Sequence, residues 1–208
     1  MRTMRLVVLV SGNGTNLQAI LDAVRSGELN ARLAVVISNK QDAYGLERAR
    51  TAGVPAVVKE KTRGQERAVY DAELAHLVGS YQPDWVVLAG WMRILSMPFI
   101  SRFPNRIINL HPALPGAFPG VDAIERAFQA YQQGKISHTG VMVHLVPDEG
   151  VDSGPLLNQC MVPIFQDDTL ETLQQKIHAC EHVVLVETLK KLAAQMEDDD
   201  AKSFVISI

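Results

Sequence analysis

The sequence predicts an α/β fold: a doubly wound, mainly parallel sheet with an antiparallel extension toward the C-terminus. Two observations support this. Short runs of β-branched and leucine residues, typical of strands buried on both faces, alternate with segments whose apolar residues recur at helical spacing. After residue 140, two apolar runs follow one another with a turn between them. Strands that alternate with helices form parallel sheets, whereas strands joined by a turn pair antiparallel.

The first five elements are two βα units and a short third strand. Residues 6–10 are a Leu and Val run that ends in a glycine-rich turn, so we expect a buried strand there. Residues 16–24 carry apolar residues on one helix face. Residues 33–38 repeat the strand pattern, residues 43–52 form a helix that stops at a glycine, and residues 55–58 are the next strand.

The middle of the chain continues the alternation. Residues 66–79 are helical, with an inward face made of Val69, Leu74, Leu77 and Val78. Residues 85–89 and 106–110 are the fourth and fifth strands, separated by a short helix at 97–102. Residues 111–120 contain three prolines and two glycines, which predicts a rigid loop.

The last part supplies the antiparallel extension. A helix is expected at 122–133, followed by strands at 140–146 and 156–162, the first with alternating polarity. Asp168 has the features of a helix N-cap, and the helix it opens runs to about residue 192. An acidic turn at 198–200 and a final strand at 204–208 complete the Rossmann-like architecture.

Composition excludes several classes of protein. The chain has 208 residues, 47% hydrophobic and 21% charged, which is average for a soluble globular domain, so we expect one domain over residues 1–208. Twenty Lys and Arg against 23 Asp and Glu give a net charge of −3, which argues against nucleic acid and anionic membranes as partners. Neither the N-terminal run nor residues 85–92 is long enough for a signal peptide or a membrane span, so we expect a cytoplasmic protein.

A glycine-rich loop follows the first strand and opens a helix, with the sequence Ser11-Gly12-Asn13-Gly14-Thr15-Asn16. Backbone N–H groups and the helix dipole at such a junction bind anions. The loop lacks the third glycine of the dinucleotide fingerprint, and no acidic residue follows the second strand. A single phosphate therefore fits better than a pyrophosphate, with a plain tight turn as the alternative.

Asn109 and His111 lie at the carboxyl end of the fifth strand, at the sheet edge where ligands bind in parallel α/β folds. One residue separates them, so they point to the same side of an extended chain. An amide donor beside an imidazole can stabilise an oxyanion and move a proton, as acyl-type transfer requires. The alternative is a structural histidine.

Residues 148–155 form an acidic, glycine-containing loop with three carboxylates, Asp148, Glu149 and Asp152. A carboxylate beside His111 would raise the pKa of the imidazole and make it a usable acid at neutral pH. The sequence alone does not bring this loop to His111, and a surface turn is the alternative.

Two further patterns have weaker implications. His178, Glu181 and His182 match the H-x-x-E-H pattern of some zinc peptidases, but no third ligand is evident downstream, and a polar stripe is the preferred interpretation, without metal. Arg67 and Arg93 are possible partners for a ligand carboxylate, or surface charges.

Taken in order, these motifs resemble the phosphoribosylglycinamide formyltransferases, the purine-biosynthesis enzymes that formylate glycinamide ribonucleotide. The resemblance covers about residues 4–186 and rests on six segments, residues 8–20, 38–40, 45–49, 88–95, 109–114 and 148–155. It implies the formyltransferase fold, 10-formyltetrahydrofolate as the formyl donor, and small-molecule substrates for a monomer or homodimer. The phosphate-binding half would be residues 1–105, and the catalytic and folate-binding half residues 106–208.

The resemblance also implies roles for individual residues. Gly14, Thr15 and Asn16 would bind the substrate phosphate, and Glu181 the ribose hydroxyls. The expected folate-binding residues are Arg67, Met92, Arg93, Ile94, Leu95, Asn109, Asp148 and Val151. The expected catalytic residues are Asn109, His111 and Asp152.

The chain departs from the family pattern at two places. After His111-Pro112 the family usually has Ser-Leu-Leu-Pro-Lys-aromatic, whereas this chain has Ala113-Leu114-Pro115-Gly116-Ala117-Phe118, so we expect a different loop shape but the same reaction. The Tyr-Pro that often follows the Glu-His pair is replaced by Val183-Val184, which we interpret as packing.

The expected mechanism is direct formyl transfer. The substrate amine attacks the formyl carbon, Asn109 and protonated His111 stabilise the oxyanion, and Asp152 keeps His111 charged and relays a proton through water to the leaving folate nitrogen. The alternative class is a nucleotide-sensing or dinucleotide-binding module. Related enzymes that formylate initiator methionyl-tRNA or nucleotide sugars, or that hydrolyse formyltetrahydrofolate, share the catalytic motifs. Because the family resemblance takes up most of the 208 residues, we expect no tRNA-binding or regulatory domain and a small-molecule acceptor.

Overall fold

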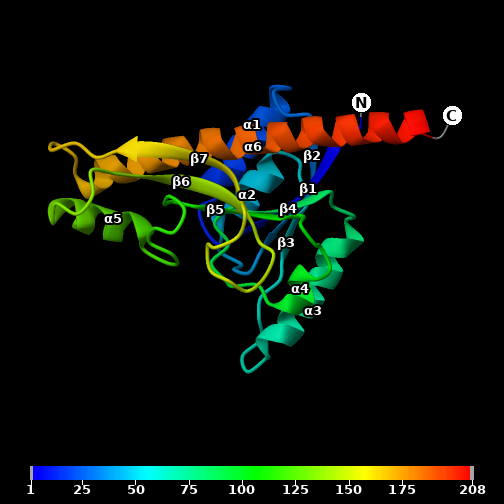
Figure 1. Cartoon of the computed structure of the whole chain (residues 1–208). Coiled ribbons are helices and arrows are strands. Elements are labelled where there is room, and N and C mark those ends of the chain that lie inside the picture. The colour runs from blue at the N-terminus through cyan, green and yellow to red at the C-terminus, as the bar shows by residue number, and fades with distance from the viewer. Residues whose placement is uncertain (1, 207–208) are drawn as a thin grey trace.

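Seven strands form one sheet in the order β3-β2-β1-β4-β5-β6-β7, in a computed structural model that describes residues 2–206 and side chains to residue 198 (Figure 1). The strands are β1 (Met4–Val10), β2 (Ala31–Ser38), β3 (Ala56–Val58), β4 (Trp85–Leu88), β5 (Ile107–His111), β6 (His138–Leu145) and β7 (Leu156–Pro163). Strands β1 to β5 are parallel, and β6 and β7 are antiparallel to their neighbours. The predicted fold class, with its antiparallel extension, is confirmed.

Helices cover both faces of the sheet. They are α1 (Thr15–Arg25), α2 (Tyr44–Thr51), α3 (Arg67–Ser80), α4 (Met97–Ile100), α5 (Ala123–Gln132) and α6 (Leu170–Ile206). Side chains of α1, α5 and α6 share one hydrophobic cluster with the sheet, and side chains of α3 and α4 share the other. Figure 1 shows α6 running along one side of the molecule and α3 and α4 on the opposite side. Within residues 2–206, no helix has an apolar stretch long enough to cross a membrane.

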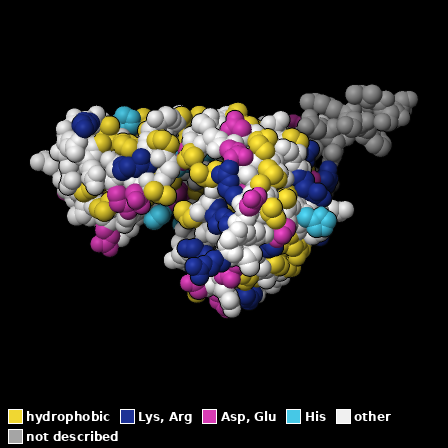
Figure 2. Space-filling view, turned by 90° about the horizontal axis from the view of Figure 1, so that it is seen from below, with side chains coloured by type: hydrophobic (Ala, Val, Ile, Leu, Met, Phe, Trp, Pro, Cys, Tyr) yellow, Lys and Arg dark blue, Asp and Glu magenta, His cyan; other side chains and the backbone are white. Residues whose placement is uncertain are grey.

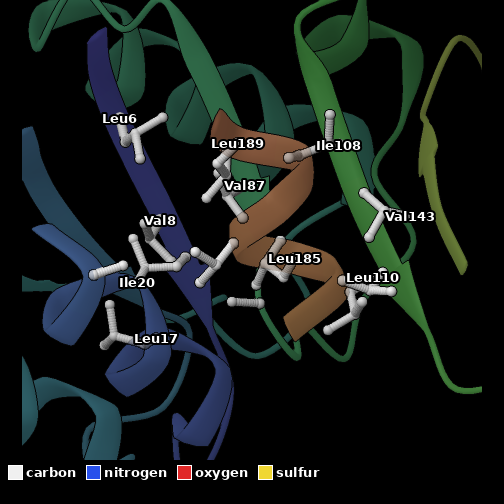
Figure 3. Close-up of a cluster of buried hydrophobic side chains, with 14 of the residues drawn as sticks. Leu6, Val8, Leu17, Ile20, Val87, Ile108, Leu110, Val143, Leu185 and Leu189 are labelled. Atoms are coloured by element: carbon white, nitrogen blue, oxygen red, sulfur yellow. The ribbon is translucent and has the colours of Figure 1, made fainter. Parts of the chain in front are cut away.

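The alternation of β1 shows why its sequence is apolar throughout. Leu6 and Val8 pack in the cluster with α1 and α6, whereas Val7 and Leu9 pack in the cluster with α3 and α4. Figure 3 shows Leu6 and Val8 on the same side as the α6 residue Leu185. A strand buried on both faces has no polar side, as the sequence predicted.

Strand β6 is present as predicted, and it is buried on both faces although its polarity alternates. Met142 and His144 are buried, as are Val141 and Val143. The strand lies between β5 and β7 rather than at the sheet edge, and His144 faces the acidic loop. The polar residue is therefore inside because it has polar partners there.

Helix α6 differs at both ends. The predicted turn at 198–200 and strand from residue 204 are wrong, because the helix continues to Ile206; residues 207–208 lie outside the described part. No glycine or proline occurs after Pro163, so nothing in the sequence interrupts the helix. At the start, Thr169 rather than Asp168 is the cap: Thr172 N donates to Thr169 Oγ1 at 3.2 Å, and Thr169 N donates to Thr172 Oγ1 at 2.9 Å.

The inward face of α3 also needs one correction. Val69 is 49% exposed, and the fully buried aromatic residue of this helix is its neighbour Tyr70. The hydroxyl of Tyr70 donates to the carbonyl of Lys59 at 2.6 Å, so an internal acceptor allows the amphipathic ring to take the buried position.

The strand order reverses between the parallel neighbours β1 and β4, which places a crevice at their carboxyl ends. The chain leaves β1 toward β2 and returns to the other side of β1 as β4. Ser11 N donates to Gly90 O at 3.0 Å, and Met92 N donates to Ser11 Oγ at 2.9 Å. The glycine-rich loop and the segment after β4 are thus tied together where doubly wound folds bind ligands.

Candidate active site

A cavity of about 780 Å³ opens at the carboxyl ends of β4 and β5. Its walls come from the segment after β4, the end of β5, the start of α3, residues 120–123 and the acidic loop. All eight residues predicted to bind folate line it, namely Arg67, Met92, Arg93, Ile94, Leu95, Asn109, Asp148 and Val151. His111 and Asp152 line it as well. The fold therefore places the predicted donor site and the predicted catalytic residues around one space.

The carboxylate of Asp152 lies at the centre of a buried polar network. Its Oδ1 accepts a hydrogen bond from Asn109 Nδ2 at 3.0 Å, and its Oδ2 accepts one from Gly120 N at 2.8 Å. His111 Nδ1 lies 3.2 Å from the same Oδ2, and both side chains are less than one-tenth exposed. The acidic loop thus reaches His111, which the sequence could not establish.

The backbone around Asp152 is tightly constrained. Asp152 has φ +51°, in the left-handed region that Asp tolerates better than most residues. Two residues later, a Cβ added at Gly154 would lie 1.8 Å from the carbonyl oxygen of Leu145. Because only glycine allows this approach, the loop packs directly against the end of β6 and brings Asp152 inward.

His144 is a site residue that the sequence analysis missed. Its Nδ1 lies 2.8 Å from Leu145 O, which can only accept, so we assign the proton to Nδ1. Its Nε2 then accepts from Asn109 Nδ2 at 3.2 Å and lies 3.6 Å from Asp152 Oδ1. Asn109 and His144 are paired across β5 and β6, so the antiparallel register is the signal that would have revealed the contact.

The loop after His111 is held by Arg126 of α5. The carbonyl of Phe118 accepts from His111 Nε2 at 3.0 Å and from Arg126 Nη2 at 2.7 Å, and Arg126 also donates to Pro119 O. Phe118 has φ +47°, unusual for a bulky residue. The altered sequence of this loop is thus accommodated in a strained turn whose carbonyl orients the imidazole.

The glycine-rich loop has the geometry of an anion site. Gly14 has φ +74° at the start of α1, and a Cβ there would lie 2.8 Å from the Cα of Gly45. The first amide bonded within the helix is Gln18 N, which donates to Gly14 O at 2.9 Å. The preceding amides, including those of Thr15 and Asn16, have no acceptor inside the helix.

Glu181 lies next to this loop. Its carboxylate is buried, and Oε2 lies 3.4 Å from Asn16 Nδ2 and 2.9 Å from His178 Nδ1. The hydrogen bond between Glu181 and His178 raises the pKa of the His178 imidazole. Residues 16 and 181, predicted for phosphate and ribose, are therefore brought together. They lie outside the lining of the 780 Å³ cavity, but Ser11 connects their loop to Gly90 and Met92, which line it. In the described part of the chain, no three His, Cys, Asp or Glu side chains are placed to hold a metal ion.

Comparison with known proteins identifies the family. Residues 4–189 match the family model described as formyl transferase. The chain is 51% identical over 199 residues to the phosphoribosylglycinamide formyltransferase of Schizosaccharomyces pombe, covering 90% of this chain and 96% of that protein. It is 42% identical to the enzyme of that name from Escherichia coli, over 87% and 83% of the two chains. The chain belongs to the formyl transferase family.

A solved structure agrees with this assignment. The glycinamide ribonucleotide transformylase 1 of Symbiobacterium toebii superposes with a TM-score of 0.86 at 46% identity, over 93% of this chain and 89% of that one. This chain is thus a formyltransferase with the family's fold.

The pKa of His111 corrects one expectation. Burial lowers the pKa of the imidazole below its ordinary 6.5, and the raising effects of Asp152 and the Phe118 carbonyl offset burial only in part. The Asp152 carboxylate raises the pKa of His111, as predicted, but the effect of burial is larger. For Asp152, burial raises the pKa, yet the neighbouring His144 side chain, the hydrogen bond from Gly120 N and the His111 imidazole together lower it below its ordinary 3.8. At neutral pH this formyltransferase therefore pairs an ionised Asp152 with a neutral His111.

Charge is mixed on the face of the molecule that Figure 2 shows. Lys and Arg side chains are interspersed there with Asp and Glu, so this face carries no broad field of one sign.

The pKa of His111 can be measured by NMR titration of its imidazole ring. We expect the His111 signal to titrate below pH 6.5, and Asp152→Asn to lower its midpoint further, because the substitution removes the carboxylate that favours the imidazolium. The signal of His76, which is exposed on α3 and lies outside this network, serves as the control. A higher His111 midpoint in the variant would contradict this assignment.

Proposed function

We propose that this formyltransferase transfers the formyl group of 10-formyltetrahydrofolate to the amine of glycinamide ribonucleotide, giving formylglycinamide ribonucleotide and tetrahydrofolate in purine biosynthesis. The observation that supports it best is the connection of two sites: an anion-binding loop beside a buried carboxylate, and a large cavity that contains Asn109, His111 and Asp152. The relatives from S. pombe and E. coli, both named phosphoribosylglycinamide formyltransferase, support the same acceptor.

In this proposal the acceptor lies between the glycine-rich loop and α6. The amides of Gly14, Thr15 and Asn16 bind its phosphate, since amides at a helix N-terminus have no acceptor within the helix. Glu181 accepts hydrogen bonds from the ribose hydroxyls, and its contact with Asn16 fixes the spacing between the two groups. Residues 1–105 thus supply the phosphate site, and residues 106–208 supply the catalytic residues.

The donor occupies the 780 Å³ cavity. Met92, Ile94 and Val151 are exposed apolar side chains at its wall, suited to a flat heterocycle. Arg67 and Arg93 supply positive charge for an acidic tail. The other proposed contacts are Leu95, Asn109 and Asp148.

The first step is attack of the acceptor's amine on the formyl carbon. The carbonyl π electrons move to oxygen and give a tetrahedral oxyanion. Asn109 donates both amide hydrogens in the structure, one to Asp152 and one to His144. A developing oxyanion is a stronger acceptor than an imidazole nitrogen such as His144 Nε2, so we assign one of these N–H groups to the oxyanion during reaction.

The second step moves a proton and expels tetrahydrofolate. The attacking nitrogen becomes an ammonium group. Its proton passes through water to Nδ1 of neutral His111, because Nε2 already donates to the carbonyl of Phe118. Asp152 Oδ2, 3.2 Å from His111 Nδ1, stabilises the imidazolium that forms. The oxyanion then collapses, the bond from carbon to the folate nitrogen breaks, and the proton passes to that nitrogen. A base role for His111 replaces the expected permanently charged imidazole because burial lowers its pKa.

The acceptor is tested with purified protein, 10-formyltetrahydrofolate and glycinamide ribonucleotide as the sole acceptor, following tetrahydrofolate release. We expect turnover that depends on both substrates. A thermal shift with NADPH tests the binding-module alternative, and stabilisation by NADPH alone, without formyl transfer, would overturn the proposal.

The catalytic assignment predicts the effect of two substitutions. We expect His111→Ala and Asp152→Asn each to lower kcat by roughly 10²-fold or more, because each removes part of the proton-transfer pair. Acceptor affinity should change little, since both residues lie outside the phosphate and ribose contacts. Near-normal turnover in either variant would show that the assignment is wrong.

A further inference from the structure

Arg67 and Glu149 form an ion pair at the rim of the donor cavity. Arg67 lies at the start of α3 and lines the cavity, and Glu149 lies in the acidic loop. The two side chains are 45% and 39% exposed, so water reaches both. A ligand that enters this cavity with a negatively charged end therefore meets an arginine that already has a carboxylate partner.

Glu149 also connects its loop to a second element. Its Oε1 accepts a hydrogen bond from Met97 N, the first amide of α4, at 3.0 Å. Three residues later, Asp152 attaches the inner end of the same loop to Asn109 and Gly120. Loss of the contact to Arg67 would thus leave the loop held at Met97 and at Asp152.

Arg93 provides the contrast. It lines the same cavity, its buried Nε has no hydrogen-bond partner among the described residues, and its guanidinium lies 4.9 Å from the ring centroid of Tyr70. Arg93 can therefore receive a ligand carboxylate without losing a protein partner, whereas Arg67 is already paired with Glu149.

We propose that Glu149 is a specificity-determining residue, which competes with the donor's terminal carboxylate for Arg67. The inference rests on the proposed function only in taking an acidic-tailed folate as the ligand. A carboxylate can replace Glu149 at Arg67 because one charge-assisted hydrogen bond is exchanged for another. A neutral tail would form a weaker hydrogen bond with Arg67 than the ion pair it would have to break, so it leaves the Arg67–Glu149 pair in place.

The test is the dissociation constant of tetrahydrofolate by calorimetry, compared with tetrahydropteroate, which lacks the glutamate tail. Glu149→Gln keeps an acceptor for Met97 N but removes the charge opposite Arg67. We expect this variant to bind tetrahydrofolate about two- to fivefold more tightly, because an exposed ion pair that competes with the ligand is worth about that much. The dissociation constant of tetrahydropteroate should stay unchanged. The gain should shrink at high salt.

Two controls separate competition from general effects. Glu66 precedes Arg67 in the sequence, is exposed, and has no ion-pair partner among the described residues. Glu66→Gln therefore also removes one negative charge near Arg67, and it should leave the dissociation constants of both ligands unchanged. In an Arg67→Gln background, Glu149→Gln should have no effect. Equal changes for both ligands, or no change for tetrahydrofolate, would overturn the inference. Failure of the proposed function is seen separately, as tetrahydrofolate binding without turnover of glycinamide ribonucleotide.

Discussion

The buried carboxylate of Asp152 is the group on which the rest of the site depends. It receives hydrogen bonds from Asn109 on β5 and from the backbone of Gly120, and it lies against His111 and near His144. Three segments that are distant in sequence therefore converge on one pair of oxygens. A buried carboxylate is tolerated only when such donors replace its lost hydration. The neighbouring His144 side chain, the hydrogen bond from Gly120 and the His111 imidazole lower its pKa, so it remains charged.

This arrangement explains why the site is strained. Asp152 and Phe118 both have positive φ, and Gly154 is pressed against the carbonyl of Leu145. Asp152 holds the acidic loop inward, and Phe118 orients the imidazole through its carbonyl. Conformations of this kind cost free energy and persist only where surrounding contacts fix them. Arg126 supplies such contacts for the loop at Phe118. The result is a neutral imidazole beside a charged carboxylate, which can accept a proton and stabilise the cation that forms.

The sequence predicted those features that depend on local pattern. Strand and helix order followed from periodicity, and the common orientation of Asn109 and His111 followed from their spacing on one strand. Features that depend on tertiary contacts were not predictable in the same way. The position of Asp152 depends on the close approach at Gly154, and the burial of His144 depends on the register between β5 and β6. The direction of the His111 pKa shift depends on the balance between burial and the neighbouring charges.

The residues of the donor cavity were predicted only from the family resemblance, because Arg67 and the segment after β4 are far apart in sequence. The length of α6 was underestimated because three consecutive aspartates were interpreted as a turn, although no helix-breaking residue accompanies them.

The central claim is that Asn109 and Asp152 act as one unit, since the amide is oriented by the carboxylate that also stabilises the imidazolium. A double-mutant cycle on kcat, with Asn109→Ala, Asp152→Asn and the double variant, measures this coupling directly. If the two residues act together, the double variant loses about as much activity as the more damaging single variant. Losses that multiply, as for two independent groups, would contradict the account.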